Sequence, residues 1–263
     1  MNCKACCASW DEERKVIVLD DRHTFARGLT KTLSACFSPD FSIAVTLKGV
    51  TEIKQKKRGK YIGNSIDKQL TDWIERTGVQ PNASDPRLIR IMDVLKEQNW
   101  TPVTSQLALG CSSLRLGTKL DLLCRDSNGC LIIIEVKCGF DDYYDICNQG
   151  NFQYPFEDVA INFRHKHFLQ LWVTRWLFTH SRHEYSEEPL NNSSYVLRIF
   201  ENKHSEIDSE LCVLPEWLCD HKLTLCLRVL ESTKNLNFRT RNRILKNGSK
   251  RSRYHFRSKR QKT

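Results

Sequence analysis

Three ionisable side chains interrupt the most hydrophobic stretch of this sequence, residues 116–140 (LGTKLDLLCRDSNGCLIIIEVKCGF). Asp121 lies within the first apolar run, and Glu135 and Lys137 lie at the end of the second. A carboxylate inside a strand is costly unless it is paired or coordinated. The three residues are therefore candidates for one shared site.

The two apolar runs are expected to form a β-hairpin that turns at Ser127-Asn128-Gly129. This pairing places Asp121 near Glu135, and the two-residue spacing places Glu135 and Lys137 on one face. Two neighbouring carboxylates repel each other, and a hard divalent cation such as Mg²⁺ removes the repulsion by taking both as oxygen ligands. Lys137 would then assist a water molecule or a phosphate. The alternative is a solvated strand end with an ordinary ion pair.

The elements around this hairpin are expected to alternate between helix and strand. Apolar spacing predicts helices over residues 65–76, 86–99 and 159–179, the second of them opening with Asp85 as N-cap and Pro86 as its first residue. Strands are expected over residues 16–21, 101–109 and 194–200 in addition to the hairpin. The order predicts one α/β domain.

The pattern Asp121-x13-Glu135-x-Lys137 resembles the active-site motif of the PD-(D/E)XK nuclease superfamily. Two further stretches resemble the branch that contains RecB and lambda exonuclease. Residues 63–70 (GNSIDKQL) resemble its first helical motif, with Asp67 at a position where the family commonly has a metal-binding His. Residues 167–172 (HFLQLW) resemble its QLxxY-type motif, in which Gln170 is retained and the Tyr is not.

The resemblance covers about residues 60–180 and implies a fold and a site. The fold would be α/β, with a mixed central sheet flanked by helices, as in the restriction-endonuclease-like core. Mg²⁺, with Mn²⁺ as a substitute, would be bound by two strand carboxylates, a backbone carbonyl and a helix carboxylate: Asp121, Glu135, Val136 and Asp67. Lys137 and Gln170 would complete the catalytic set.

The same resemblance implies an activity, namely hydrolysis of phosphodiester bonds in duplex or single-stranded DNA by metal-activated water. An exonuclease of viral or cellular DNA replication and recombination is favoured, by analogy with the branch. Two alternatives remain open. One is a catalytically silent nucleic-acid-binding protein that has a nuclease-like fold, and the other is an RNA-processing endonuclease.

The net charge of +10 comes from one end of the chain. Residues 239–263, here called the basic tail, contain 11 Lys or Arg and no acid, which leaves the rest with a net charge of −1 (+10 minus +11). The tail is expected to be disordered, to contact phosphates through Lys250, Arg251 and Arg253, and to bind a nuclear-import receptor. A loop expected over residues 48–60 would add further phosphate contacts: Lys56, Lys57, Arg58 and Lys60.

The expected organisation is an N-terminal extension of unknown role (residues 1–47), a nuclease-like domain (48–238) and the basic tail. The sequence has no recognisable signal peptide and no run of about 20 apolar residues, so neither secretion nor a membrane partner is expected. The nucleus, or otherwise the cytoplasm, is the expected location.

The chain has 12 cysteines, and a reducing compartment is expected to keep them as thiols. Cys111, Cys124 and Cys130 fall in apolar strand patterns, where a free Cys behaves as a small hydrophobe. An iron–sulfur cluster is not expected, because residues 212, 219 and 226 are Cys at intervals of seven and lack the tight spacing of such clusters.

Overall fold

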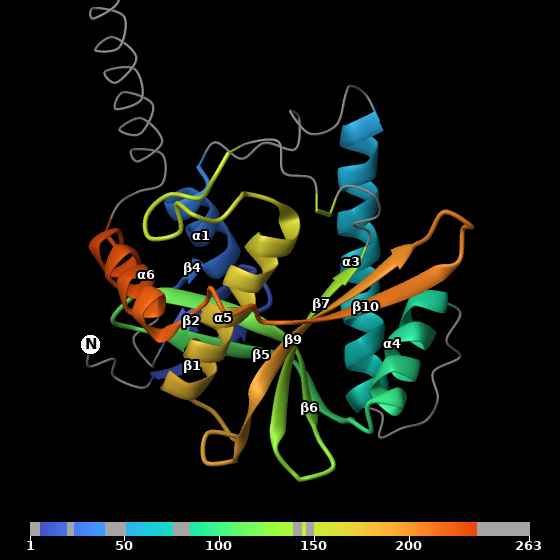
Figure 1. The fold of residues 1–263 in the computed structure, drawn as a ribbon. Coiled ribbons are helices and arrows are strands. Elements are labelled where there is room, and N and C mark those ends of the chain that lie inside the picture. The colour runs from blue at the N-terminus through green and yellow to red at the C-terminus, as the bar shows by residue number, and fades with distance from the viewer. Residues whose placement is uncertain are drawn as a thin grey trace, which may run out of the picture.

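The computed structural model describes residues 6–19, 24–39, 51–75, 85–138, 144–145 and 150–235, and only the backbone of residues 51–60 (Figure 1). Its helices are α1 (Leu29–Phe37), α3 (Thr51–Glu75), α4 (Pro86–Glu97), α5 (Phe163–His180) and α6 (Asp220–Ser232). Its strands are β1 (Cys6–Asp11), β2 (Val16–Leu19), β3 (Thr24–Phe25), β4 (Arg27–Gly28), β5 (Thr101–Cys111), β6 (Leu116–Arg125), β7 (Leu131–Cys138), β8 (Ser181–Arg182), β9 (Leu190–Glu201) and β10 (Ile207–Val213).

The strands form two mixed sheets. The larger has the order β10-β9-β7-β6-β4, with β5 also paired to β6, and the smaller has the order β3-β2-β1-β8. In the larger sheet, β6 is antiparallel to β5 and β7, while β7 is parallel to β9. The expected α/β class is therefore confirmed.

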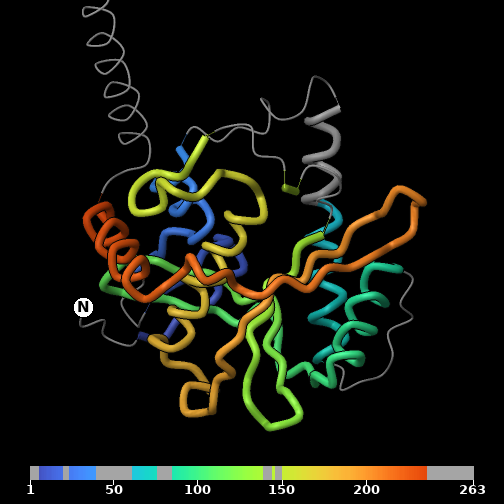
Figure 2. Tube along the Cα trace, in the orientation of Figure 1, coloured from blue at the N-terminus to red at the C-terminus, as the bar shows by residue number. Residues whose placement is uncertain are grey.

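Helices cover both faces of the larger sheet (Figures 1 and 2). Ile132 and Ile134 of β7 belong to a core shared with α3 and α4, whereas Leu131 and Ile133 belong to a core shared with α1, α5 and α6. Strand β7 is therefore apolar on both faces, as expected for a strand buried between two helical layers. Its polar residues begin only at Glu135.

Two helix starts follow from side-chain caps. The Asp85 side chain accepts a hydrogen bond from the Arg87 backbone N–H at 3.0 Å, which confirms the predicted start of α4 at Pro86. Helix α5 begins at Phe163 and not near residue 159, because the Asn162 side chain accepts from the His165 backbone N–H at 2.7 Å. The core of the predicted helix is confirmed with a later start.

The loop predicted over residues 48–60 is wrong for residues 51–60, which form the first turns of α3. This run (TEIKQKKRGK) contains no proline and is rich in Lys, Gln, Glu and Arg, which are good helix formers. Its helix propensity outweighs the mutual repulsion of its basic side chains. The helix predicted from residue 65 is confirmed and extends further toward the N-terminus.

The described part of residues 1–47 packs onto the larger sheet. Strand β4 pairs in parallel with β6 at Gly117, and Leu33 and Phe37 of α1 enter the same core as α5. The approach is close, since a Cβ built on Gly117 would lie 2.8 Å from the Ala26 Cβ. Glycine is required there by this contact with the segment before β4.

The cysteines differ in state. Cys124 is a buried free thiol and Cys130 a half-buried one, as expected. Cys111 is disulfide-bonded, so the expectation of a free thiol is wrong at this position. Among the described residues, no helix is both long enough and apolar enough to cross a membrane.

Candidate active site

The candidate site forms where strands β6 and β7 diverge. The hairpin turn sets their register, because Asp126 Oδ1 accepts from the backbone N–H groups of Asn128 and Cys130 at 2.9 Å and Gly129 adopts φ +83°. The predicted hairpin is thus confirmed. Pairing continues only as far as Leu122 and Ile134, and the next residues of each strand are free to turn their side chains toward one another.

Asp121, Glu135 and Lys137 meet just beyond this divergence. Asp121 Oδ2 accepts hydrogen bonds from the Val136 backbone N–H at 3.0 Å and from Lys137 Nζ at 3.3 Å. Lys137 Nζ also donates to Glu135 Oε1. One ammonium group therefore contacts two carboxylates from neighbouring strands.

Glu135 is the most buried charged group in this cluster, with 1% of its surface exposed. Its Oε1 accepts from Lys137 and Gln170, whereas its Oε2 has no hydrogen-bond partner among the described residues. Burial, and then the nearby Asp121, raise the pKa of Glu135 to about 8, although Lys137 opposes the shift. In the metal-free protein, burial and repulsion from Asp121 therefore disfavour the ionised form of Glu135.

Asp67 reaches the same region from α3. Burial and then the charge of Asp121 raise the pKa of Asp67 to about 6, while Lys137 and Lys119 act in the opposite direction. Thr71, one turn later, donates to the Asp67 carbonyl at 2.9 Å and bonds the Ser105 hydroxyl of β5 at 2.8 Å. These contacts fix this turn of α3 against the strand that pairs with β6.

Asp67 does not join Asp121 and Glu135 in a tight group of ligands. Within the ranges that the structure describes, no three His, Cys, Asp or Glu side chains are placed to hold a metal ion as they stand. The two strand carboxylates share the Lys137 ammonium group, whereas Asp67 interacts with Asp121 through charge repulsion, which raises the pKa of Asp67. The ligand role of the Val136 carbonyl stays a prediction, although the Val136 N–H does orient Asp121.

Gln170 contacts the site from the opposite layer. It is 7% exposed on α5, and its amide nitrogen donates to Glu135 Oε1. One turn earlier, buried His167 bonds the Tyr144 hydroxyl through Nδ1 at 3.0 Å, and burial followed by Lys137 lowers the pKa of His167 well below its ordinary value. Gln170 and His167 therefore bring no charge to the site at neutral pH.

One residue of β5 that the sequence did not indicate occupies the register position opposite Asp121 of β6. Gln106 lies between the paired positions Ser105–Leu122 and Leu107–Leu120, and so falls opposite Asp121. It has φ +55°, an unusual conformation for a residue other than glycine, and its buried Nε2 has no partner among the described residues. Nothing in the local sequence marks this position.

Arginine and lysine side chains flank the carboxylates. Arg198 of β9 pairs in register with Lys137 of β7. Its guanidinium carbon lies 4.7 Å from the centre of the Tyr144 ring, and its Nη1 lies 3.4 Å from Glu210 Oε2. On the other side, Lys119 Nζ lies 4.2 Å from the centre of the Trp10 ring. Strand alternation in residues 194–200 could have indicated Arg198, but the partner strand could not be known from the sequence.

The predicted phosphate contacts are not brought to the site by any described feature. The side chains of residues 56–58 and 60 lie outside the described part of α3, as do all residues of the basic tail, Lys250, Arg251 and Arg253 included. Their roles stay predictions.

No protein-family model matches this chain, and no curated protein matches it significantly.

Proposed function

We propose that this protein is a Mg²⁺-dependent nuclease of the PD-(D/E)XK type that hydrolyses phosphodiester bonds in DNA, with Mn²⁺ as a substitute metal. The observation that carries the proposal is the meeting of Asp121 and Glu135 on a single ammonium group, Lys137, where two paired strands diverge. A buried cluster of this composition is unfavourable for stability alone, because two carboxylates share one countercharge.

The residues fit a hard cation. Glu135 Oε2 is buried without a hydrogen-bond partner among the described residues, and a buried carboxylate oxygen without a partner is costly. Magnesium typically binds proteins through one or two carboxylates together with waters and phosphate oxygens, so Asp121 and Glu135 suffice. Asp67 and the Val136 carbonyl would extend the ligand set, directly or through water.

The cation, when bound, supplies positive charge that activates a water and neutralises a phosphate oxygen. The chain's own residues then divide the remaining work. The Val136 N–H holds Asp121 in place, and Gln170 orients Glu135 by donating to Oε1. Both contacts fix carboxylate oxygens in the geometry that the metal requires.

Lys137 acts as a donor in this proposal. Burial alone would lower the pKa of Lys137, but the charges of Asp121 and Glu135 raise it above its ordinary value. The side chain therefore stays an ammonium ion at neutral pH, which suits it to stabilise the negative charge that develops on a phosphate oxygen. Removing a proton from water is less compatible with this state.

Exonuclease action, a role in viral or cellular replication and recombination, and nuclear location belong to the same proposal and rest on the resemblance and on the basic tail. The deciding experiment is digestion of end-labelled linear DNA and covalently closed circular DNA by the purified full chain, with Mg²⁺ or with EDTA. An exonuclease degrades the linear form and spares the circle.

Two variants sharpen this experiment. Glu135→Gln removes a metal ligand, whereas Asp126→Asn changes a carboxylate of the same hairpin at its turn, away from the site. Loss of Mg²⁺-dependent cleavage in Glu135→Gln alone supports the proposal. If the wild-type protein binds DNA and never cleaves it, the protein is the catalytically silent nucleic-acid-binding alternative. If it cleaves RNA in preference to DNA, it is the RNA-processing alternative.

A further inference from the structure

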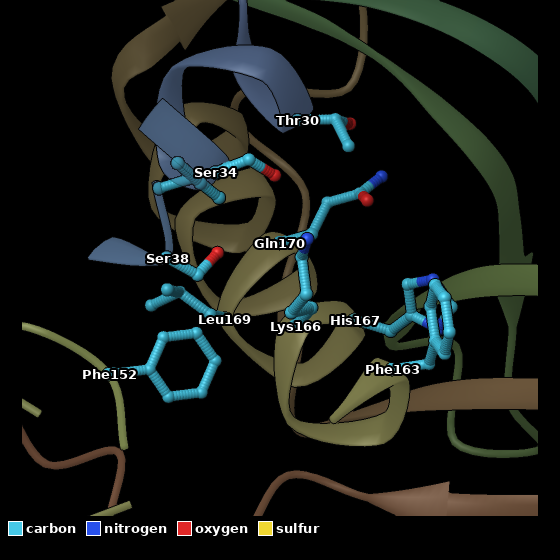
Figure 3. A pocket seen from close by; sticks show the side chains of 10 residues that line it. Thr30, Ser34, Ser38, Phe152, Phe163, Lys166, His167, Leu169 and Gln170 are labelled. Atoms are coloured by element: carbon cyan, nitrogen blue, oxygen red, sulfur yellow. The ribbon is translucent and has the colours of Figure 1, made fainter. Parts of the chain in front are cut away.

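A cavity of about 200 Å³ lies between α1 and α5, next to the candidate active site (Figure 3). Most of its surface is carbon, contributed in part by the apolar side chains of Leu33, Phe152, Phe163 and Leu169, while Lys166 is a charged residue of the wall. The volume is about seven times the ~30 Å³ that a water molecule occupies in the liquid, which leaves room for one small ring system. The cavity is therefore a compartment of molecular size, with a mostly carbon surface and several polar groups in its wall.

The cavity and the proposed metal carboxylate share a wall residue. Gln170 lines the cavity and also donates to Glu135 Oε1. A group bound in the cavity would thus lie one side chain away from the carboxylate that the proposed chemistry uses. Thr30 is exposed and also lines the cavity, so the compartment has an edge open to solvent.

A buried hydroxyl in the wall has no partner of its own. Ser38 is 3% exposed, and its Oγ forms no hydrogen bond with any described residue. Figure 3 shows this oxygen directed toward the space between the lining side chains, with the Ser34 hydroxyl on the same side of α1. Buried polar atoms are nearly always bonded, so an unbonded one in a cavity wall indicates a ligand atom or a water.

The lining selects among the parts of a nucleic acid. Lys166 also lines the cavity and could pair with one phosphate oxygen. A phosphate would nevertheless bring negative charge into a space whose surface is mostly carbon and that lies close to Glu135, which is unfavourable. A nucleobase has flat apolar faces and a polar edge, which match the aromatic and aliphatic walls and the Ser38 and Ser34 hydroxyls. Enzymes that hold an extruded base do so with this combination of apolar faces and edge hydrogen bonds.

We propose that the α1–α5 cavity binds an unpaired nucleobase of the substrate, beside the phosphate that Asp121 and Glu135 act on. This inference rests on the proposed action on nucleic acids. Because a base within a duplex cannot enter the cavity, the preferred substrate is a single strand or a frayed duplex end. Ser38 and Ser34 contact the edge of the base, and the Phe side chains contact its faces.

The test measures binding in EDTA, where no cleavage occurs. One probe is a fluorescently labelled single-stranded oligonucleotide, and its twin lacks one base at a terminal position. The full-length wild-type protein should bind the complete strand about tenfold more tightly than the abasic twin, with the abasic position scanned from each end. Equal affinity for the two strands at every position overturns the proposal.

Two cavity variants and one control complete the design. Ser34→Leu fills the cavity and should remove the preference for the base, whereas Ser232→Leu makes the same change at an exposed position of α6 and should retain it. Ser38→Val removes only the hydroxyl and should reduce the preference. If Ser34→Leu fails to fold, an undiminished preference in Ser38→Val overturns the proposal.

The outcome separates the two proposals. If the cavity variants remove the preference for the base and the protein never cleaves nucleic acid with Mg²⁺, the nuclease proposal is wrong and the base site is retained. Cleavage of DNA by a protein with no base preference retains the nuclease and sinks the base site.

Discussion

Gln170 of α5 donates a hydrogen bond to Glu135 Oε1 of β7, and this contact joins the candidate metal carboxylate to the wall of the α1–α5 cavity. The two residues lie 35 positions apart and belong to different layers of the fold. Lys137 donates to the same oxygen, so Glu135 Oε1 accepts two hydrogen bonds, whereas Oε2 has no hydrogen-bond partner among the described residues. This asymmetry leaves one oxygen available for a cation.

Removing either strand carboxylate should abolish the chemistry without unfolding the protein. Asp121→Asn and Glu135→Gln should each lower Mg²⁺-dependent cleavage by more than about a hundredfold, because losing even a group that supports a metal ligand costs 10–100-fold. Initial rates on end-labelled DNA measure the effect, with circular dichroism to check folding. Wild-type rates in a purified Glu135→Gln protein would refute the site.

The stability of the metal-free protein should depend on pH through Glu135. Its folded pKa of about 8 exceeds the ordinary value of 4.5, so the folded state binds more protons in between, and stability falls as pH rises through that interval. Asp67, raised to about 6, contributes in the same direction. Glu135→Gln should reduce the loss of unfolding free energy between the two pKa values, by an amount on the order of a few kcal/mol.

Urea unfolding at pH 5 and at pH 8, in EDTA, measures this dependence for the wild type and for Glu135→Gln. Added Mg²⁺ should stabilise the wild type more at pH 8 than at pH 5, because protons compete with the metal for the carboxylates. If the free energy of unfolding of the wild type changes no more between pH 5 and pH 8 than that of the variant, the raised pKa of Glu135 is contradicted.

Replacing Gln170 should weaken metal use more than folding. Gln170→Ala removes the donor to Glu135 and should lower the cleavage rate by roughly 10–100-fold, while raising the Mg²⁺ concentration needed for half-maximal rate. Gln98→Ala, at the exposed C-cap of α4, is the matched control. A rate loss in Gln170→Ala with an unchanged Mg²⁺ requirement would show that the residue does not act through the metal ligand.

The backbone at Gln106 should prefer glycine. With φ +55°, a side chain costs about 1 kcal/mol, and Gln106→Gly also removes an amide nitrogen that is buried without a described partner. The glycine variant should unfold at an equal or higher urea concentration than the wild type. Gln106→Val should be clearly less stable, since β-branched residues rarely adopt positive φ; equal midpoints for the two variants would argue against backbone strain.

The basic tail should contribute binding and not chemistry. Deleting residues 239–263 removes 11 positive charges and should weaken binding to long DNA, and the salt slope of log K should fall by about 0.9 for each phosphate that the tail neutralises. Cleavage of short substrates should persist. In eukaryotic cells, a fluorescent fusion without the tail should lose nuclear accumulation; an unchanged salt slope and unchanged nuclear location would assign the tail neither role.

Local chemistry made several features predictable from the sequence. Asp126 and Gly129 specify the hairpin turn, and the period of a strand then places Glu135 and Lys137 on one face. The Asp85 cap likewise defined the start of α4. Each of these signals acts between residues only a few positions apart, so the sequence carries it explicitly.

The tertiary structure alone decided which distant residues meet. Gln106 lies opposite Asp121 only through the register of β5 on β6, and Ser38 lines the cavity only because α1 packs against α5 on one face of the sheet. Such positions depend on long-range packing and strand register, and a side-chain pattern within one segment does not encode its partner. The sequence therefore determined the chemistry at the end of β7, and the packing of the layers determined the walls around it.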